Sequence, residues 1–292
     1  MSRAARVLCE GIYYGEAPRW RNGRLWFSDF FAQAVKSASL SGDVRTEFTI
    51  DDAPSGLGWA PDGSMLLVSM MKRRVLRRSP SGAIGLHADL SGIATFHCND
   101  MAVDQSGAAY VGNFGFDLHH ELAARGDQSV LADHPTAKLA RISPQGVAEV
   151  AADDLHFPNG TVITPDGKTL ILAETLAARL TAFDIGPDGG LSGRRVWAST
   201  LPRVPDGIAL DAEGAVWIAN PLGSECVRIA PGGEVIETIA TSHNCFACML
   251  GGDDGKTLFM LTAPTSMPKE ASATPKGRIE VATVDASHAG LP

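Results

Sequence analysis

One local pattern recurs six times along the chain: a short turn that ends in glycine and is followed, after one or two residues, by an apolar segment. Asn-Gly or Asp-Gly between two segments of β character is a strong signal for a β-hairpin, because glycine accepts a positive φ. We therefore predict six hairpins. Their turns are Arg21-Asn22-Gly23, Pro61-Asp62-Gly63, Gln105-Ser106-Gly107, Pro165-Asp166-Gly167, Ala212-Glu213-Gly214 and Asp253-Asp254-Gly255.

The spacing of these turns indicates the architecture. The hairpin glycines are 40, 44, 60, 47 and 41 residues apart, and residues 73–79 and 82–88 add two further strand-like segments to the second repeat. Six units of about 40–50 residues with four strands each favour a six-bladed β-propeller over an irregular two-sheet sandwich. We predict an all-β fold with residues 1–292 as a single domain. Residues 4–9 would close the ring as the outer strand of a blade completed by residues 278–284.

Charge and composition exclude several partners. The 25 Lys and Arg against 33 Asp and Glu give a net charge of −8, and no basic stripe suits nucleic acid or an anionic membrane. No apolar run could span a membrane, and the N-terminal segment lacks the core of a secretory signal. Five scattered cysteines do not form a disulfide scaffold. We expect a cytoplasmic monomer or small homo-oligomer that acts on a small molecule.

One position in each repeat points to a metal. It lies eight residues before the hairpin glycine, or seven in the first repeat, where the innermost strand should begin near one end of the central channel. Four of the six residues there carry oxygen ligands, which suit Ca²⁺, Mg²⁺ or Mn²⁺, and Zn²⁺ less naturally. The alternative is that they cap strand ends or form turns. The six residues are Glu16, Ser55, Asn99, Asn159, Asp206 and Ala247.

Four strings in the sequence resemble the senescence-marker-protein/gluconolactonase/regucalcin-like family: GEAPRW (15–20), CNDMAVDQSGAAYVGN (98–113), FPNGTVITPDG (157–167) and VPDGIALDAEGAVWIAN (204–220). The resemblance covers roughly residues 11–262. It implies a six-bladed propeller with one divalent ion in its channel and the hydrolysis of lactones, usually sugar lactones. Some relatives act on other lactones or on organophosphates.

The same resemblance implies roles for individual residues. Glu16, Asn159 and Asp206 match metal ligands, and Asp206 also matches the catalytic residue that passes protons. Asn99 matches a position that contacts substrate or metal, and Asp117 aligns with a substrate-contacting acidic residue. His97 stands where sugar-lactone members carry Arg. Without a bidentate guanidinium, the substrate need not be a sugar lactone.

The longest interval, of 60 residues, marks an insertion at about 115–137. This segment breaks the strand pattern, and a helix is expected near residues 118–124. Long insertions in compact domains are usually functional or disordered, so we predict a lid with Phe116 and Asp117 at the pocket wall. The alternative is an excursion on the outer rim.

These observations leave three functions open. The first is a metal-dependent hydrolase that opens a lactone ring, with Asp206 as the base and His97 as a second base or a hydrogen-bond donor to the substrate. The second is a hydrolase of another ester or of an organophosphate, because the same cation can polarise a P=O bond. The third is a non-catalytic, metal-binding propeller scaffold. Cys245 and Cys248 have the spacing of a redox pair, but packing against the channel wall is the expected role.

Overall fold

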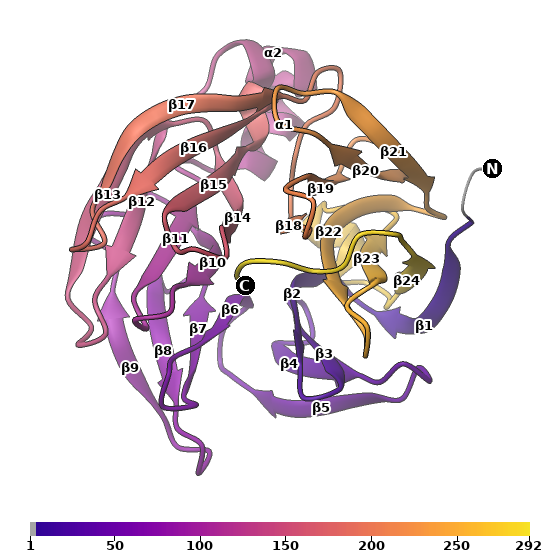
Figure 1. The fold of residues 1–292 in the computed structure, drawn as a ribbon, viewed down its shortest axis with the longest axis horizontal. Helices are drawn as coiled ribbons and strands as arrows, with labels where there is room; N and C mark the ends of the chain where they lie inside the picture. Colours follow the sequence, from indigo (N-terminus) through magenta and orange to yellow (C-terminus); the bar gives the residue numbers. More distant parts are fainter. Residues whose placement is uncertain (1–3) are drawn as a thin grey trace.

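Six four-stranded antiparallel sheets follow one another around a ring in the computed structural model, which describes residues 4–292 (Figure 1). The prediction of an all-β six-bladed propeller is confirmed. The first three residues of the range expected to form the domain lie outside the described residues.

The blades are numbered along the chain, and each runs from its innermost to its outermost strand. Blade 1 consists of β2 (Gly15–Arg21), β3 (Arg24–Asp29), β4 (Ala34–Ala38) and β5 (Val44–Thr49). Blade 2 consists of β6 (Pro54–Trp59), β7 (Met65–Ser69), β8 (Arg74–Arg78) and β9 (Ile84–Asp89). Blade 3 consists of β10 (Cys98–Val103), β11 (Ala109–Asn113), β12 (Ala137–Ile142) and β13 (Ala148–Leu155). Blade 4 consists of β14 (Pro158–Ile163), β15 (Thr169–Glu174), β16 (Arg179–Ile185) and β17 (Leu191–Ser199). Blade 5 consists of β18 (Ile208–Leu210), β19 (Val216–Asn220), β20 (Glu225–Ile229) and β21 (Val235–Ala240). Blade 6 consists of β22 (Asn244–Gly251), β23 (Thr257–Ala263), β24 (Gly277–Thr283) and β1 (Arg6–Ile12).

The ring closes through the two ends of the chain. Strand β1 pairs antiparallel with β24, with Arg6 opposite Val281 and Ile12 opposite Gly277. The N-terminal strand therefore completes the last blade, as expected from residues 4–9 and 278–284. A propeller closed in this way leaves only short outer edges exposed.

Apolar clusters fill the spaces between neighbouring blades and hold the ring together. Between blades 1 and 2, for example, Leu57 and Leu67 are buried together, and the rings of Trp26 and Trp59 meet edge to face at 5.6 Å. The six predicted hairpin glycines all have positive φ, from 69° at Gly167 to 87° at Gly107. The turns thus set the register that presents each apolar face to the next blade.

The C-terminal segment lies across one end of the ring, and Figure 1 shows it reaching the centre. Its residue Leu291 exchanges two backbone hydrogen bonds with Ile163, the last residue of β14. Farther back, Ala289 donates to Leu210 in blade 5 and His288 donates to Gly255 in blade 6. The segment therefore joins blades 4, 5 and 6 where their inner strands end. Asn159 lies near the start of β14, toward the other end of the channel.

Within residues 4–292, helices occur at three places outside the blades. The long interval folds into α1 (Leu118–Arg125) and α2 (Asp127–Ala132), so the helix expected near residues 118–124 is present. A 3₁₀ turn, η1 (Thr175–Ala177), follows β15, and α3 (Pro268–Ala271) precedes β24. Among residues 4–292, none of the helices has the length and apolar character needed to cross a membrane.

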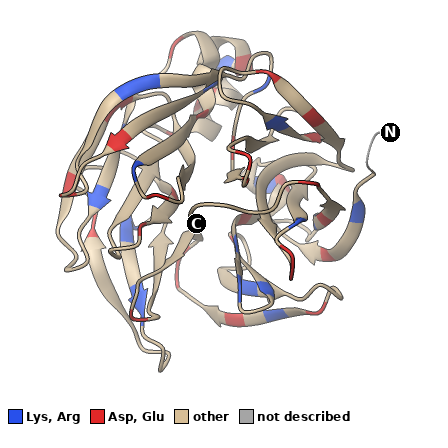
Figure 2. Ribbon diagram, viewed as in Figure 1, with Lys and Arg blue, Asp and Glu red and all other residues tan. Residues whose placement is uncertain are grey.

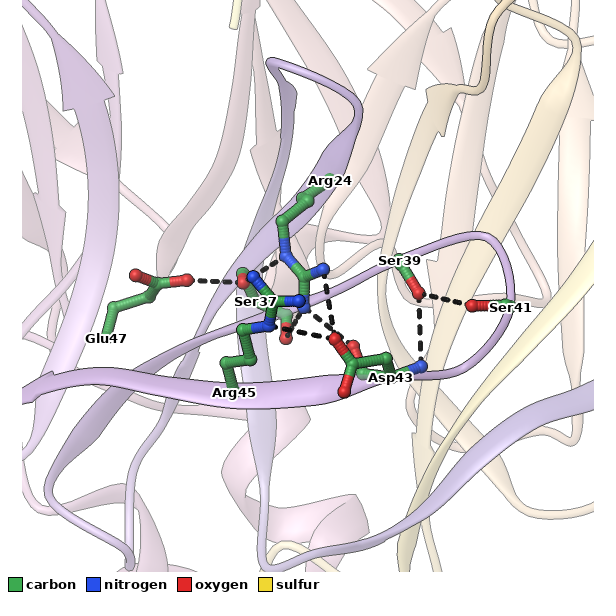
Figure 3. Close-up of polar contacts among 7 residues, drawn as sticks. All are labelled: Arg24, Ser37, Ser39, Ser41, Asp43, Arg45 and Glu47. Carbon is green, nitrogen blue, oxygen red and sulfur yellow. Dashed lines mark hydrogen bonds and ion pairs between the residues drawn. The ribbon is translucent and has the colours of Figure 1, made fainter.

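Charged residues of both signs are spread over the outer strands and loops, as Figure 2 shows. On blade 1 such residues link three strands (Figure 3). The guanidinium of Arg24 donates to the hydroxyl of Ser37 at 2.7 Å and to the carbonyl of Asp43, while Ser37 donates to Glu47. Arg45 also pairs with Asp43 at 2.9 Å. Exposed pairs of this kind each contribute at most about 1 kcal/mol, so the clusters between blades carry most of the stability.

Candidate active site

The inner strands share an irregularity that shapes the channel. In five blades the pairing of the first and second strands shifts at the equivalent position or directly next to it. A β-bulge bends the strand and turns side chains that would otherwise point into the blade. In blade 5, regular pairing of the first two strands begins only at Ile208. The backbone amide of Asp206 donates a hydrogen bond to the carbonyl of Ala219, which fixes the position of Asp206. The shifts lie between Glu16 and Arg19, Pro54 and Leu57, Cys98 and Met101, Pro158 and Thr161, and Cys245 and Ala247.

Glycine directly after two of these positions brings the inner strands close together. The amide of Gly160 donates to the carbonyl of Asp206 at 3.2 Å, and a Cβ at Gly160 would lie 2.6 Å from that oxygen. A Cβ at Gly207 would lie 2.7 Å from the Cα of Ala247. These glycines therefore allow neighbouring blades to pack closely around Asn159 and Asp206. In the sequence, a role for Asn159 and Asp206 in turns had remained the alternative.

A cavity of about 300 Å³ opens at this end of the channel. The side chains of Glu16, Asn99, Asn159 and Asp206 line it together. Ser55 and Ala247, which occupy the two other equivalent positions, are buried but are not among the described residues that line the cavity. The four oxygen-bearing positions singled out from the repeat thus converge in one cavity.

Two carboxylates face this cavity without a cationic partner. Glu16 and Asp206 are 9% and 8% exposed, and among the described residues no Lys or Arg lines the cavity or pairs with either. Burial and the nearby carboxylates of Asp206 and Asp100 raise the pKa of Glu16 well above its ordinary value. Burial also raises the pKa of Asp206, although a hydrogen bond with Asn159 opposes the shift.

This donor set fits a divalent cation. Two buried carboxylates that repel each other are stabilised when a cation binds between them, and the amide oxygens of Asn99 and Asn159 complete an all-oxygen set. No group of three or more His, Cys, Asp or Glu side chains in residues 4–292 could hold a metal ion. A cation at this place would therefore need the amide oxygens in addition to Glu16 and Asp206.

A buried ion pair lies directly beside the candidate ligands. Arg19, three residues after Glu16, pairs with Asp100 at 2.7 Å, and the two side chains are 5% and 10% exposed. The same guanidinium donates to the backbone carbonyls of Leu57 and Met101, which belong to blades 2 and 3. Sequence reasoning missed this pair. The available signal was a charged residue in the middle of each of two inner strands, Arg19 in β2 and Asp100 in β10.

Two histidines line the cavity above the carboxylates. His97 stacks on Phe96 with ring centroids 4.0 Å apart, and His119 lies on α1. Burial lowers the pKa of both imidazoles, so both are neutral at neutral pH. His97 thus lines the same cavity as Asn99 and can donate or accept a hydrogen bond there.

Phe116 and Asp117 were expected at the pocket wall, but the structure puts them elsewhere. Both line a separate hollow together with His134, on which Phe116 stacks. Asp117 is the N-cap of α1 and accepts a hydrogen bond from the amide of His120. Because the helix starts here, the side chains of this segment that reach the main cavity come from α1 itself, beginning with Leu118.

The cysteines have a packing role, but between two blades and not against the channel wall as expected. Cys245 and Cys248 are buried in the apolar cluster between blades 5 and 6, together with Cys226. All described cysteines are free thiols, and burial raises the pKa of Cys245 and of Cys226.

Comparison with known proteins identifies the family. A family model described as "SMP-30/Gluconolactonase/LRE-like region" matches residues 14–264. This chain belongs to that family. The resemblance found in the four sequence strings is confirmed, over nearly the same range.

Individual members of the family are distant relatives. Regucalcin from Danio rerio is 28% identical over 282 residues, which cover 91% of this chain and 88% of the relative. Regucalcin from Agrobacterium tumefaciens, described as a calcium-binding protein, is similar with a TM-score of 0.80 at 20% identity, covering 100% of this chain and 97% of its own. A gluconolactonase from Xanthomonas campestris gives a TM-score of 0.73 at 21% identity, covering 100% and 92%. At these identities the two structures support the propeller fold alone.

Proposed function

We propose that this protein is a metal-dependent hydrolase that opens a lactone ring. The observation that carries the proposal is the convergence of Glu16 and Asp206, buried and without a cationic partner among the described residues, with two amide side chains in one cavity. Membership of a family that includes gluconolactonases supports the reaction class. A related regucalcin described as calcium-binding supports a divalent cation, and Ca²⁺, Mg²⁺, Mn²⁺ and Zn²⁺ are the candidates.

In this proposal Glu16, Asn159 and Asp206, together with Asn99, hold the cation through oxygen atoms. When bound, the cation supplies Lewis-acid polarisation of the lactone carbonyl and a lowered pKa for water. Asn99 and the neutral imidazole of His97 offer hydrogen bonds that orient the oxygen atoms of the substrate. The Arg19–Asp100 pair links the inner strands of blades 1 and 3 and thereby positions Glu16 and Asn99.

Asp206 acts as the general base. The oxygen of water bonds to the carbonyl carbon while its proton passes to the carboxylate of Asp206. The ring C–O bond then breaks, and the same proton passes to the alkoxide that leaves, which yields a hydroxy acid. A positioned base of this kind contributes about 10²–10⁴-fold to the rate.

A hydrolysis screen tests the proposal. Sugar, aliphatic and aromatic lactones and one phosphotriester are incubated with the protein in a pH-indicator assay, with and without a chelator. We expect turnover of at least one lactone that is lost with the chelator and restored by added cation. Turnover of the phosphotriester alone would favour the second candidate function. The absence of turnover from cation-loaded protein would favour a scaffold.

A further inference from the structure

The wall of the cavity above the oxygen ligands is apolar. In five blades the residue two positions before the candidate ligand position lines the cavity. Four of these five residues have side chains whose surface is mainly carbon. They provide two aromatic rings, a methyl group and a branched side chain, and His97 is the exception. The five residues are Tyr14, Ala53, His97, Phe157 and Val204.

A second layer of apolar side chains follows the second strands of the blades. Phe30, Met70 and Phe114 are each the first residue after the second strand of their blade, and all three line the cavity. They belong to one apolar cluster together with Tyr14 and Phe157. Ring centroids are 5.3 Å apart for Tyr14 and Phe30, and 4.6 Å apart for Phe114 and Phe157. This cluster lies over the cavity and not between two blades.

The inserted helices complete this wall. Leu118 and Leu122 of α1 are four residues apart, on one side of the helix, and both line the cavity. Val130 of α2 also lines it and is fully buried. The insertion therefore adds apolar surface to the pocket, which is the contribution expected of a lid.

The two buried carboxylates and the two amides of the pocket lie in or just before inner strands of the blades. Above them, the wall also offers the two imidazoles, Thr175, Asp127 at the start of α2 and Ser266 near α3. No guanidinium or ammonium group lines the cavity among the described residues. A polyhydroxylated ring would exchange its hydrogen bonds with water for contacts with aromatic and aliphatic carbon, which is unfavourable.

We infer that the substrate carries an apolar arm, an alkyl chain or an aryl ring, on its lactone ring. This inference rests on the proposed lactonase function. The ring carbonyl lies toward Glu16 and Asp206, and the arm lies between the cluster that contains Phe30 and Phe114 and the α1 helix. A cavity of about 300 Å³ is at the small end of the range for ligand pockets, so the arm is of limited length.

A series of γ-lactones tests the inference. The probes are γ-butyrolactone and its γ-ethyl, γ-butyl and γ-hexyl derivatives, with glucono-1,5-lactone as the polar comparison. We expect kcat/KM to rise by about fourfold for each methylene that becomes fully buried, and then to level off. Glucono-1,5-lactone is expected to fall below the γ-butyl compound. Equal values across the series, or a preference for glucono-1,5-lactone, would overturn the inference and leave a lactonase of another specificity.

A matched pair of variants locates the arm. Met71 lines the cavity and is 59% exposed, so Met71→Gln replaces apolar surface by an amide with little risk to folding. Leu86, 63% exposed on the outer strand β9, supplies the control Leu86→Gln. We expect Met71→Gln to raise KM for the γ-hexyl lactone about five- to tenfold, with a smaller effect on γ-butyrolactone, and the control to match the parent. The same KM change for both lactones in Met71→Gln would contradict this placement of the arm.

A binding measurement separates this inference from the proposed function. 3-Alkylcyclopentanones have the shape of the γ-alkyl lactones, with a methylene in place of the ring oxygen, but cannot be hydrolysed, and their affinity is measured by calorimetry with cation-loaded protein. Affinity that rises with chain length supports an apolar-arm ligand even if no lactone turns over, in which case the proposed function alone fails. Affinity that does not depend on chain length overturns the inference even if lactones are hydrolysed.

Discussion

Replacing Gly160 by alanine tests whether close packing of blades 4 and 5 positions Asp206. The added Cβ would lie 2.6 Å from the carbonyl oxygen of Asp206 and from the amide nitrogen of Ile208. Both atoms belong to the backbone, so they must move by about 0.8 Å to reach an ordinary contact near 3.4 Å. Overpacking of this kind costs about 1–3 kcal/mol. The displaced segment carries Asp206, and a misplacement of about 1 Å costs on the order of 10²-fold in rate.

The assay compares Gly160→Ala with Gly85→Ala. Gly85 lies on the outer strand β9, and a Cβ there would meet nothing within 4 Å. At about 2 °C for each kcal/mol in a chain of this size, we expect Gly160→Ala to lower Tm by about 2–6 °C in chelator. Added cation should raise its Tm less than that of the parent. Gly85→Ala should leave both quantities within error or raise Tm slightly. Parent-like stability, cation response and turnover in Gly160→Ala would refute the reasoning.

Three further predictions follow from the site. Asp206→Asn should lose about 10²–10⁴-fold in turnover at saturating cation, because an amide offers an oxygen but cannot accept the proton of water; a rate within threefold of the parent would remove Asp206 as the base. Arg19→Met should lower the free energy of unfolding by about 3–5 kcal/mol in urea titrations, since it leaves Asp100 buried without its partner, and a loss below 1 kcal/mol would contradict this. Replacing residues 118–134 with a short Gly/Ser turn should preserve Tm and cation content but change selectivity across the lactone series; unchanged KM values would defeat the lid.

The repeat made much of this molecule predictable. Six hairpin turns with a regular spacing define six equivalent units, and equivalence alone places Glu16, Asn99, Asn159 and Asp206 at one level of one channel. Equivalence of the repeats can be recognised without knowledge of side-chain packing. The sequence was therefore sufficient to predict the six-bladed fold and the convergence of these four residues. The ring closure by β1 and β24 followed from the same count of strands.

Features that break the repeat could not be read in the same way. The insertion has no equivalent in other blades. The family resemblance and the expected lid therefore put Asp117 and Phe116 in the pocket, whereas α1 starts there and brings Leu118 and Leu122 to the cavity. The Arg19–Asp100 pair joins two different blades, and only the three-dimensional arrangement shows that these two charges meet.

A cation titration monitored by turnover tests the central claim most directly. Protein stripped with a chelator is titrated with Ca²⁺, Mg²⁺, Mn²⁺ or Zn²⁺ while the hydrolysis of the best lactone and the amount of bound cation are measured on the same sample. Glu16→Gln serves as the variant that lacks one carboxylate, because affinity for hard cations follows the charge and number of ligands. We predict that activity rises in proportion to bound cation up to one equivalent per chain, and that Glu16→Gln needs far more cation. Full activity in chelated protein, or parent-like cation binding by Glu16→Gln, would contradict the account.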